Sequence, residues 1–114
     1  MANGDSVYQS AETWHVKLQD AISATDNGVW IDTRGYPDGS IGVTIATTAT
    51  IQIRGSDAPT IPANNTDGNQ LGSDVTASTT LDLTDAPRWL KCKISAWTSG
   101  AVTVTATLRR RASS

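Results

Sequence analysis

Short runs of alternating apolar and polar residues recur along this chain and are separated by turn-forming residues. The clearest run spans residues 88–97 and a second spans 101–109; in both, every other residue is apolar. Alternation with a period of two is typical of a β-strand that buries one face. The inward residues predicted for these two runs are Leu90, Cys92, Ile94, Ala96, Val102, Val104, Ala106 and Leu108.

Weaker alternation predicts further strands at residues 29–34, 41–46, 51–54 and 79–83. Residues 10–18 fit either a helical turn or a strand, and the alternation of their apolar residues favours the strand. Two connections carry the residues of tight turns. Asn27-Gly28 suits a type I′ hairpin, because both residues tolerate positive φ angles, and residues 98–100 predict a second hairpin.

Glycine, asparagine, aspartate and proline interrupt the chain every eight to twelve residues or so, which is the spacing of a sandwich or barrel. The sequence therefore predicts an all-β fold: a single antiparallel β-sandwich of seven or eight strands, with a jelly roll as the leading topology. The 114 residues are enough for one domain. We expect an N-terminal arm at 1–10, the sandwich at 11–109 and a short basic tail at 110–114.

Residues 55–76 form the longest stretch without clear alternation, and they contain two prolines and few large apolar residues. An irregular segment of this length inside a compact domain is usually functional or mobile. Asparagine, threonine and aspartate within residues 65–69 offer oxygen ligands at alternate positions, which hints at calcium. The segment lacks the glycine and the terminal glutamate of an EF-hand loop, so an ordinary polar loop is favoured.

The composition excludes several classes of protein. The net charge is −2, whereas general nucleic-acid binding requires a basic face, so no nucleic-acid partner is expected. No apolar run approaches the length of a membrane-spanning helix. The first residues have neither the basic nor the apolar region of a signal peptide, so none is expected. We expect no membrane partner.

Few residues could carry catalysis, because the chain has one histidine, one cysteine and one glutamate. Structural metal sites need several cysteines or histidines, and a Ser-His-Asp triad cannot be assigned. We therefore expect no enzyme, no metal and no cofactor. His15 is interpreted as an ordinary surface or packing residue, and Cys92 as a buried small side chain. A weaker alternative is acid–base chemistry by paired aspartates, Asp82 with Asp85 or Asp32 with Asp38.

The two tryptophans of the run 88–97 are the strongest candidates for partner contacts. Trp89 and Trp97 are predicted to share one strand face with Lys91 and Lys93, opposite the leucine, cysteine and isoleucine face. Tryptophan is enriched in interface hot spots. Two alternatives stand: the face is covered by the chain's own loop or second sheet, or it meets a partner.

The end of the chain is basic. Arg109, Arg110 and Arg111 form either a solvated tail or an electrostatic contact with an acidic patch of a partner. Arginine suits such a contact because its planar guanidinium pairs with carboxylates through two hydrogen bonds.

Several segments of the chain carry a resemblance to small structural proteins of tailed bacteriophages. They are the strand that ends in Gly55-Ser56-Asp57, then Leu71-Gly72-Ser73, Arg88-Trp89-Leu90-Lys91 and the segment 97–104. Within that group the chain is most similar to β-sandwich head decoration, or cement, proteins, and the similarity covers about the C-terminal half.

The resemblance implies a non-enzymatic protein of the virion that binds the outside of the assembled capsid and bridges subunits of the major capsid protein. It also implies a homo-oligomer, a dimer or trimer, and assembly in the bacterial cytoplasm. The alternative is a carbohydrate-binding or tail receptor-binding module, in which Trp30, Tyr36 and Trp89 would form a stacking platform for sugars.

Overall fold

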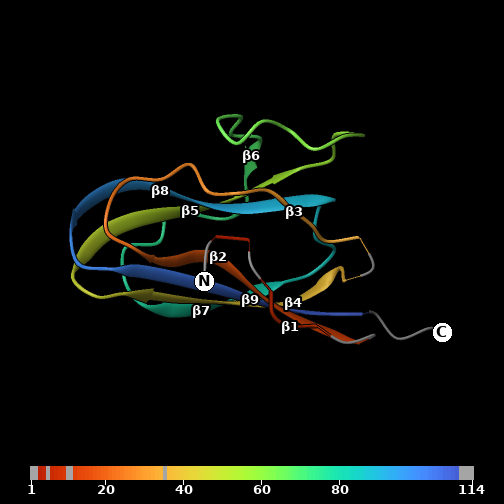
Figure 1. The fold of residues 1–114 in the computed structure, drawn as a ribbon, viewed down its shortest axis with the longest axis horizontal. Coiled ribbons are helices and arrows are strands. Elements are labelled where there is room, and N and C mark those ends of the chain that lie inside the picture. Colours follow the sequence, from red (N-terminus) through yellow and green to blue (C-terminus); the bar gives the residue numbers. More distant parts are fainter. Residues whose placement is uncertain (1–2, 5, 10–11, 35, 111–114) are drawn as a thin grey trace.

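The protein folds into two antiparallel β-sheets that pack face to face in the computed structural model (Figure 1), which describes residues 3–4, 6–9, 12–34 and 36–110. Among these residues no helix is long and apolar enough to span a membrane. The strands are β1 (Ser6–Gln9), β2 (Thr13–Ile22), β3 (Ile31–Asp32), β4 (Asp38–Ile45), β5 (Thr48–Ser56), β6 (Asn69–Gln70), β7 (Thr79–Leu83), β8 (Trp89–Ser99) and β9 (Val102–Arg109). The predicted sandwich is confirmed.

The strand order is that of a jelly roll. Sheet A has the order β1-β2-β9-β4-β7, and sheet B has the order β3-β8-β5-β6. Four strand pairs are nested within one another: β2 with β9, β3 with β8, β4 with β7, and β5 with β6. The whole segment from β2 to β9 is therefore one long hairpin that is folded over. Pairing of β4 with β9 and of β5 with β8 then closes the roll.

Two connections that the sequence predicted as hairpins are arches from one sheet to the other. Residues 23–30 lead from β2 in sheet A to β3 in sheet B, and Gly28 takes a φ of 79° there. Residues 100–101 lead from β8 in sheet B to β9 in sheet A. The hairpin predictions are wrong because the same glycines with positive φ serve both kinds of connection.

A β-bulge in β8 changes which side chains face the core. Ile94 pairs with Ile51, but Trp97 pairs with Ala49, so β8 has one residue more than β5 between these pairs. The additional residue shifts the alternation by one. Ala96 is therefore exposed and Trp97 packs against the core. The prediction that Trp89 and Trp97 share a face is wrong.

The core fills the space between the sheets with aliphatic side chains from β2, β4, β5, β8 and β9. All but one of the inward residues predicted for the last two strands are buried; the exception is Ala96. Cys92 is buried as expected, and burial raises the pKa of its thiol to about 12.

One polar side chain joins the two sheets through the core. Gln19 lies in β2 beside an irregularity in its pairing with β9, and its side chain is fully buried. Its Nε2 donates to the carbonyl of Cys92 in β8 at 2.7 Å, and its Oε1 accepts from Asn3 at 2.8 Å. The amide satisfies polar groups that would otherwise be stranded between the sheets.

The chain ends differ in part from the expected division. The segment expected to be an N-terminal arm contains β1, which pairs with β2 and forms one edge of sheet A. The strand predicted at 10–18 is present as β2. At the other end β9 stops at Arg109, and the rest of the expected tail beyond Arg110 lies outside the described residues.

We expect Gln19→Met to lower the free energy of unfolding by about 1–3 kcal/mol, because the Cys92 carbonyl and the Asn3 amide then lose a buried partner. Equilibrium unfolding in urea measures the change. Lys17→Met on the outer face of the same strand is the matched control, with an expected change within about 0.5 kcal/mol. Equal effects of the two substitutions would contradict the role of Gln19.

Candidate functional site

The most distinctive surface of the protein is built by the β5–β6 loop, residues 57–68. This loop lies over the outer face of sheet B, on the side away from sheet A (Figure 1). Most of its residues are exposed. The side chains beneath it come from the segment before β3 and from β8.

Lys91 is the centre of this arrangement. Its side chain is fully buried, and its Nζ donates to the carbonyls of Asn64 at 2.7 Å and of Thr66 at 2.8 Å. The ammonium also lies 4.8 Å from the centroid of the Trp30 ring and 3.9 Å from a carboxylate oxygen of Asp67. Carbonyl dipoles, an aromatic face and a carboxylate thus replace the water that a buried ammonium loses.

Burial has a measurable electrostatic consequence. Desolvation lowers the pKa of Lys91 below its ordinary value, and the nearby carboxylate of Asp67 opposes that change. A charged lysine in this position therefore requires the loop that shields it and supplies its hydrogen-bond acceptors.

Two tryptophans and an arginine hold the loop at other points. The indole Nε1 of Trp89 donates to the carbonyl of Ala58 at 3.0 Å, and that of Trp30 donates to the carbonyl of Ala63 at 3.0 Å. Arg88 donates to the carbonyl of Pro59 at 2.8 Å. Side chains that lie beneath the loop thus donate hydrogen bonds to backbone carbonyls between residues 58 and 66. These hydrogen bonds fix the path of an irregular segment.

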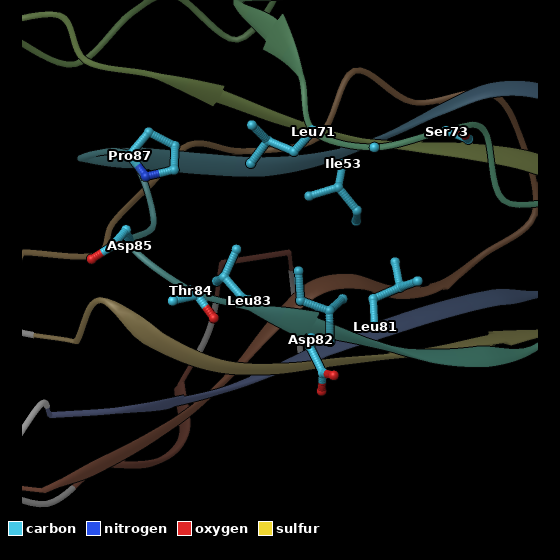
Figure 2. A pocket seen from close by; sticks show the side chains of 11 residues that line it. Ile53, Leu71, Ser73, Leu81, Asp82, Leu83, Thr84, Asp85 and Pro87 are labelled. Carbon is cyan, nitrogen blue, oxygen red and sulfur yellow. The ribbon is translucent and has the colours of Figure 1, made fainter.

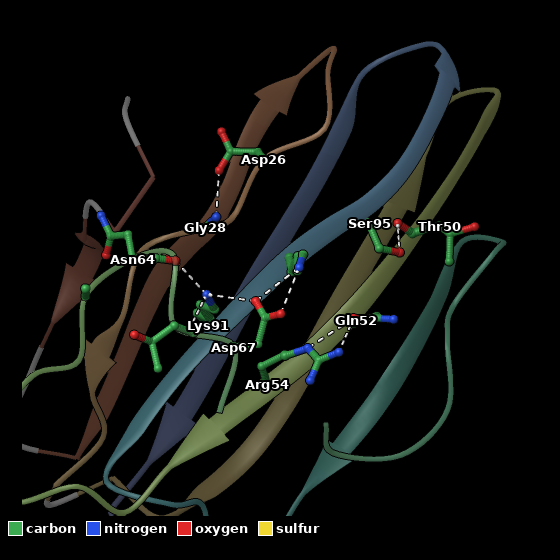
Figure 3. Close-up of polar contacts among 12 residues, drawn as sticks. Asp26, Gly28, Thr50, Gln52, Arg54, Asn64, Asp67, Lys91 and Ser95 are labelled. Atoms are coloured by element: carbon green, nitrogen blue, oxygen red, sulfur yellow. Dashed lines mark hydrogen bonds and ion pairs between the residues drawn. The ribbon is translucent and has the colours of Figure 1, made fainter. Parts of the chain in front are cut away.

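The rest of this face is polar and hydrogen-bonded. Lys93 donates to both carboxylate oxygens of Asp67, at 3.0 and 3.1 Å (Figure 3). This hydrogen bond is the main reason why the pKa of Asp67 lies below its ordinary value. Farther along the face, Arg54 donates to Gln52, which in turn donates to Asp74.

Of the oxygen side chains that hinted at calcium, the carboxylate of Asp67 lies near the Lys91 ammonium. The backbone carbonyls of Asn64 and Thr66 approach the same ammonium, which supplies the positive charge at that point (Figure 3). Among the described residues no group of three or more histidines, cysteines or acidic residues could hold a metal ion.

Local sequence explains why the loop approaches the sheet so closely. Gly68 has a φ of 59°, and a Cβ at this position would lie 2.4 Å from the carbonyl oxygen of Gly55. Only glycine accommodates both the conformation and the contact. Pro59 and Pro62 restrict the backbone at the far end of the loop.

The loop presents one large apolar side chain to solvent. Ile61 lies between the two prolines and is 57% exposed, although the backbone on both sides of it is held by Arg88 and Trp30. The sequence analysis missed Ile61, because an isolated isoleucine in an irregular segment gives no periodic signal. Its place between two prolines was the available indication.

The structure separates the residues predicted to bind a partner. Trp89 and Lys91 lie under the chain's own loop, which is the first of the two alternatives stated above. Lys93 is partly exposed and paired with Asp67. Trp97 lies on the core side of the bulge and donates to the carbonyl of Gly100.

Two of the three arginines predicted to form a basic contact lie within the described residues. Arg109 and Arg110 are exposed, and Arg111 lies outside the described residues. The backbone of Arg110 donates to the carbonyl of Glu12, which holds the start of this segment beside β2.

The sugar platform considered for the alternative function is not assembled as expected. Trp30 and Trp89 are both buried by the loop. Tyr36 is half-buried, and its ring centroid lies 5.8 Å from that of Trp14. Stacking on a sugar requires an open aromatic face, which the two buried rings do not offer.

Three of the four aspartates considered for catalysis, Asp32, Asp38 and Asp85, make structural contacts. Asp32 lies 3.8 Å from both Arg34 and Arg88. The carboxylate of Asp38 accepts from the backbone N–H of Asp85 at 3.1 Å, which supports the turn after β7. His15 contacts the hydroxyl of Thr107 across the sheet at 3.3 Å.

Comparison with known proteins identifies no relative: no protein-family model, no curated protein and no solved structure matches this chain. The interpretation of the site therefore depends on its geometry.

We expect Lys91→Met to lower the free energy of unfolding by about 1–3 kcal/mol, because the carbonyls of Asn64 and Thr66 lose their donor. Urea unfolding measures the stability, and limited proteolysis measures the opening of residues 57–68. Lys93→Met is the matched control, since its ion pair with Asp67 is partly exposed and contributes at most about 1 kcal/mol. Unchanged protease resistance of the loop in Lys91→Met would contradict this account.

Asp67 should add a pH-dependent contribution to stability. Its folded pKa is lowered, so the stabilisation is complete above the ordinary pKa of 3.8 and is lost as the pH falls through the folded value. The difference in unfolding free energy between wild type and Asp67→Asn should therefore shrink between about pH 6 and about pH 2. A difference that does not change over this range would show that the carboxylate charge is irrelevant.

Proposed function

We propose that this protein is a non-enzymatic structural protein of a bacteriophage particle, which binds the outside of the capsid and bridges subunits of the major capsid protein. The observation that carries the proposal is the β5–β6 loop, in which Ile61 is exposed on a backbone held by the half-buried Arg88 and the buried Trp30. A surface ordered before binding loses little conformational entropy when it meets a partner.

Three further features support this function. The jelly-roll topology recurs in viral capsid proteins, although it also occurs in lectins and enzymes, so it raises the expectation without deciding it. The sequence segments that resemble head decoration proteins include Gly55 to Asp57 and Arg88 to Lys91, which flank the loop or lie beneath it. A copy that binds several capsid subunits at once also gains affinity through avidity, even where each single contact is weak.

The proposal assigns the main contact to the loop and a second contact to the end of β9. Ile61 would enter an apolar depression on the capsid, and the exposed Arg109 and Arg110 would pair with acidic residues of the same or a neighbouring subunit. The protein would be assembled onto particles in the bacterial cytoplasm.

The test uses capsids that lack the protein, mixed with purified wild type or variants and then separated by sedimentation. We expect wild type to bind with a fixed number of copies per particle. Ile61→Asp should bind at least about tenfold more weakly, because a charged side chain replaces the apolar contact at the centre of the surface. Bound copies are counted on gels.

Val7→Asp is the matched control, because Val7 is also a highly exposed apolar residue, at 48%, but lies in β1 at the edge of sheet A. It should bind like wild type. Wild-type protein that does not sediment with capsids would refute the function. Full binding by Ile61→Asp would refute the role of the loop.

A further inference from the structure

The outer edge of β7 is the least protected strand edge among the described strands. The two edges of sheet B, β3 and β6, are two residues long, and β1 has an irregular register between Ser6 and Tyr8. In contrast, β7 pairs with β4 over five consecutive residues without a bulge. Short strands and bulges are the usual means by which proteins prevent edge-to-edge pairing, and β7 has neither.

An apolar cleft opens directly beside this edge. It has a volume of about 330 Å³ and lies between β7 of sheet A and the residues around β6 of sheet B. Figure 2 shows Leu81 and Leu83 on one side facing Ile53 and Leu71 on the other. The cleft shows that the sandwich interior is incompletely covered here. A sixth strand of sheet A, added beside β7, would place its inward side chains in this space.

The alternation of β7 suits pairing with itself. Its inward positions are Thr79, Leu81 and Leu83, opposite Val43, Ile41 and Gly39 of β4. In an antiparallel pair centred on Leu81, each Leu81 would lie opposite its counterpart, and each Leu83 opposite Thr79 of the other copy. The four leucines would then form one continuous apolar strip across both clefts.

The charges also suit a second copy. The carboxylate of Asp82, which lies at the rim of the cleft, points away from Ile53 and Leu71 (Figure 2), and in this register Asp82 lies opposite Thr80 of the second copy. The two copies of Asp82 are then diagonal neighbours and not directly opposed, and each carboxylate has a threonine hydroxyl opposite it. Asp85 would lie opposite Ala77 of the second copy, so no like charges meet directly.

We propose that two copies of this chain pair through the β7 edges around a two-fold axis at Leu81, which joins their A sheets into one and closes the two apolar clefts against each other. The contact is isologous, because each copy uses the same surface. It leaves the β5–β6 loop and Ile61 on the outer face of sheet B uninvolved. The dimer therefore does not depend on the proposed capsid binding, and either can fail without the other.

Sedimentation equilibrium over a wide range of protein concentrations tests the dimer. We expect wild type to approach twice the 12.0 kDa of one chain. Thr79→Arg should remain monomeric, because it places a guanidinium opposite Leu83 of the other copy. Thr79 is exposed in the single chain, so circular dichroism and thermal unfolding should show an intact fold. Val7→Arg on the opposite edge of sheet A is the control and should dimerise like wild type.

An engineered disulfide tests the position of the two-fold axis at Leu81. Residues opposite each other in an antiparallel pair have Cα atoms about 4.5–5.5 Å apart, within the range for a disulfide. Leu81→Cys should therefore give a covalent dimer under mild oxidation. The native Cys92 should not react, because it is buried and its pKa is raised to about 12. Val7→Cys is the control and should crosslink far more slowly.

A wild-type chain that stays monomeric at all concentrations would overturn the inference. A dimer that survives Thr79→Arg, or that crosslinks no faster at residue 81 than at residue 7, would use another surface and would overturn it equally.

Discussion

The buried ammonium of Lys91 is the constraint on which the candidate binding surface depends. A charged group on β8 is stable beneath a protein surface only if acceptors replace its lost water, and here the carbonyls of Asn64 and Thr66 provide them. The β5–β6 loop must therefore follow one path across sheet B. Because that path is set, Ile61 is presented in one position.

The jelly roll supplies the support for this loop. β8 is buried on both faces at its start, with Leu90 against the core and Lys91 beneath the loop. In sheet B, β8 pairs with β5 on one side and with β3 on the other, so the anchoring side chains project from a sheet that the whole core stabilises. The loop has few large apolar residues of its own and takes its order from these contacts.

Period-two alternation was sufficient to predict the sandwich and most of its core, since Leu90, Cys92 and Ile94 are buried as expected. It failed at Trp97, because a single additional residue in a bulge reverses the two faces and leaves no mark on the pattern. It also could not distinguish a hairpin from an arch, since Gly28 and Gly100 serve either connection. Cover of Trp89 and Lys91 by the chain's own loop was one of two alternatives, and the sequence could not decide between them, because the contacts of residues 58–66 depend on tertiary packing.

Backbone order in the β5–β6 loop is the most direct test of this account. Amide nitrogen relaxation should give the non-proline residues of 58–66 order parameters close to those of β5 and β8, about 0.85. Values below about 0.6 across the loop would show a flexible segment. They would contradict the claim that buried side chains hold a preformed binding surface.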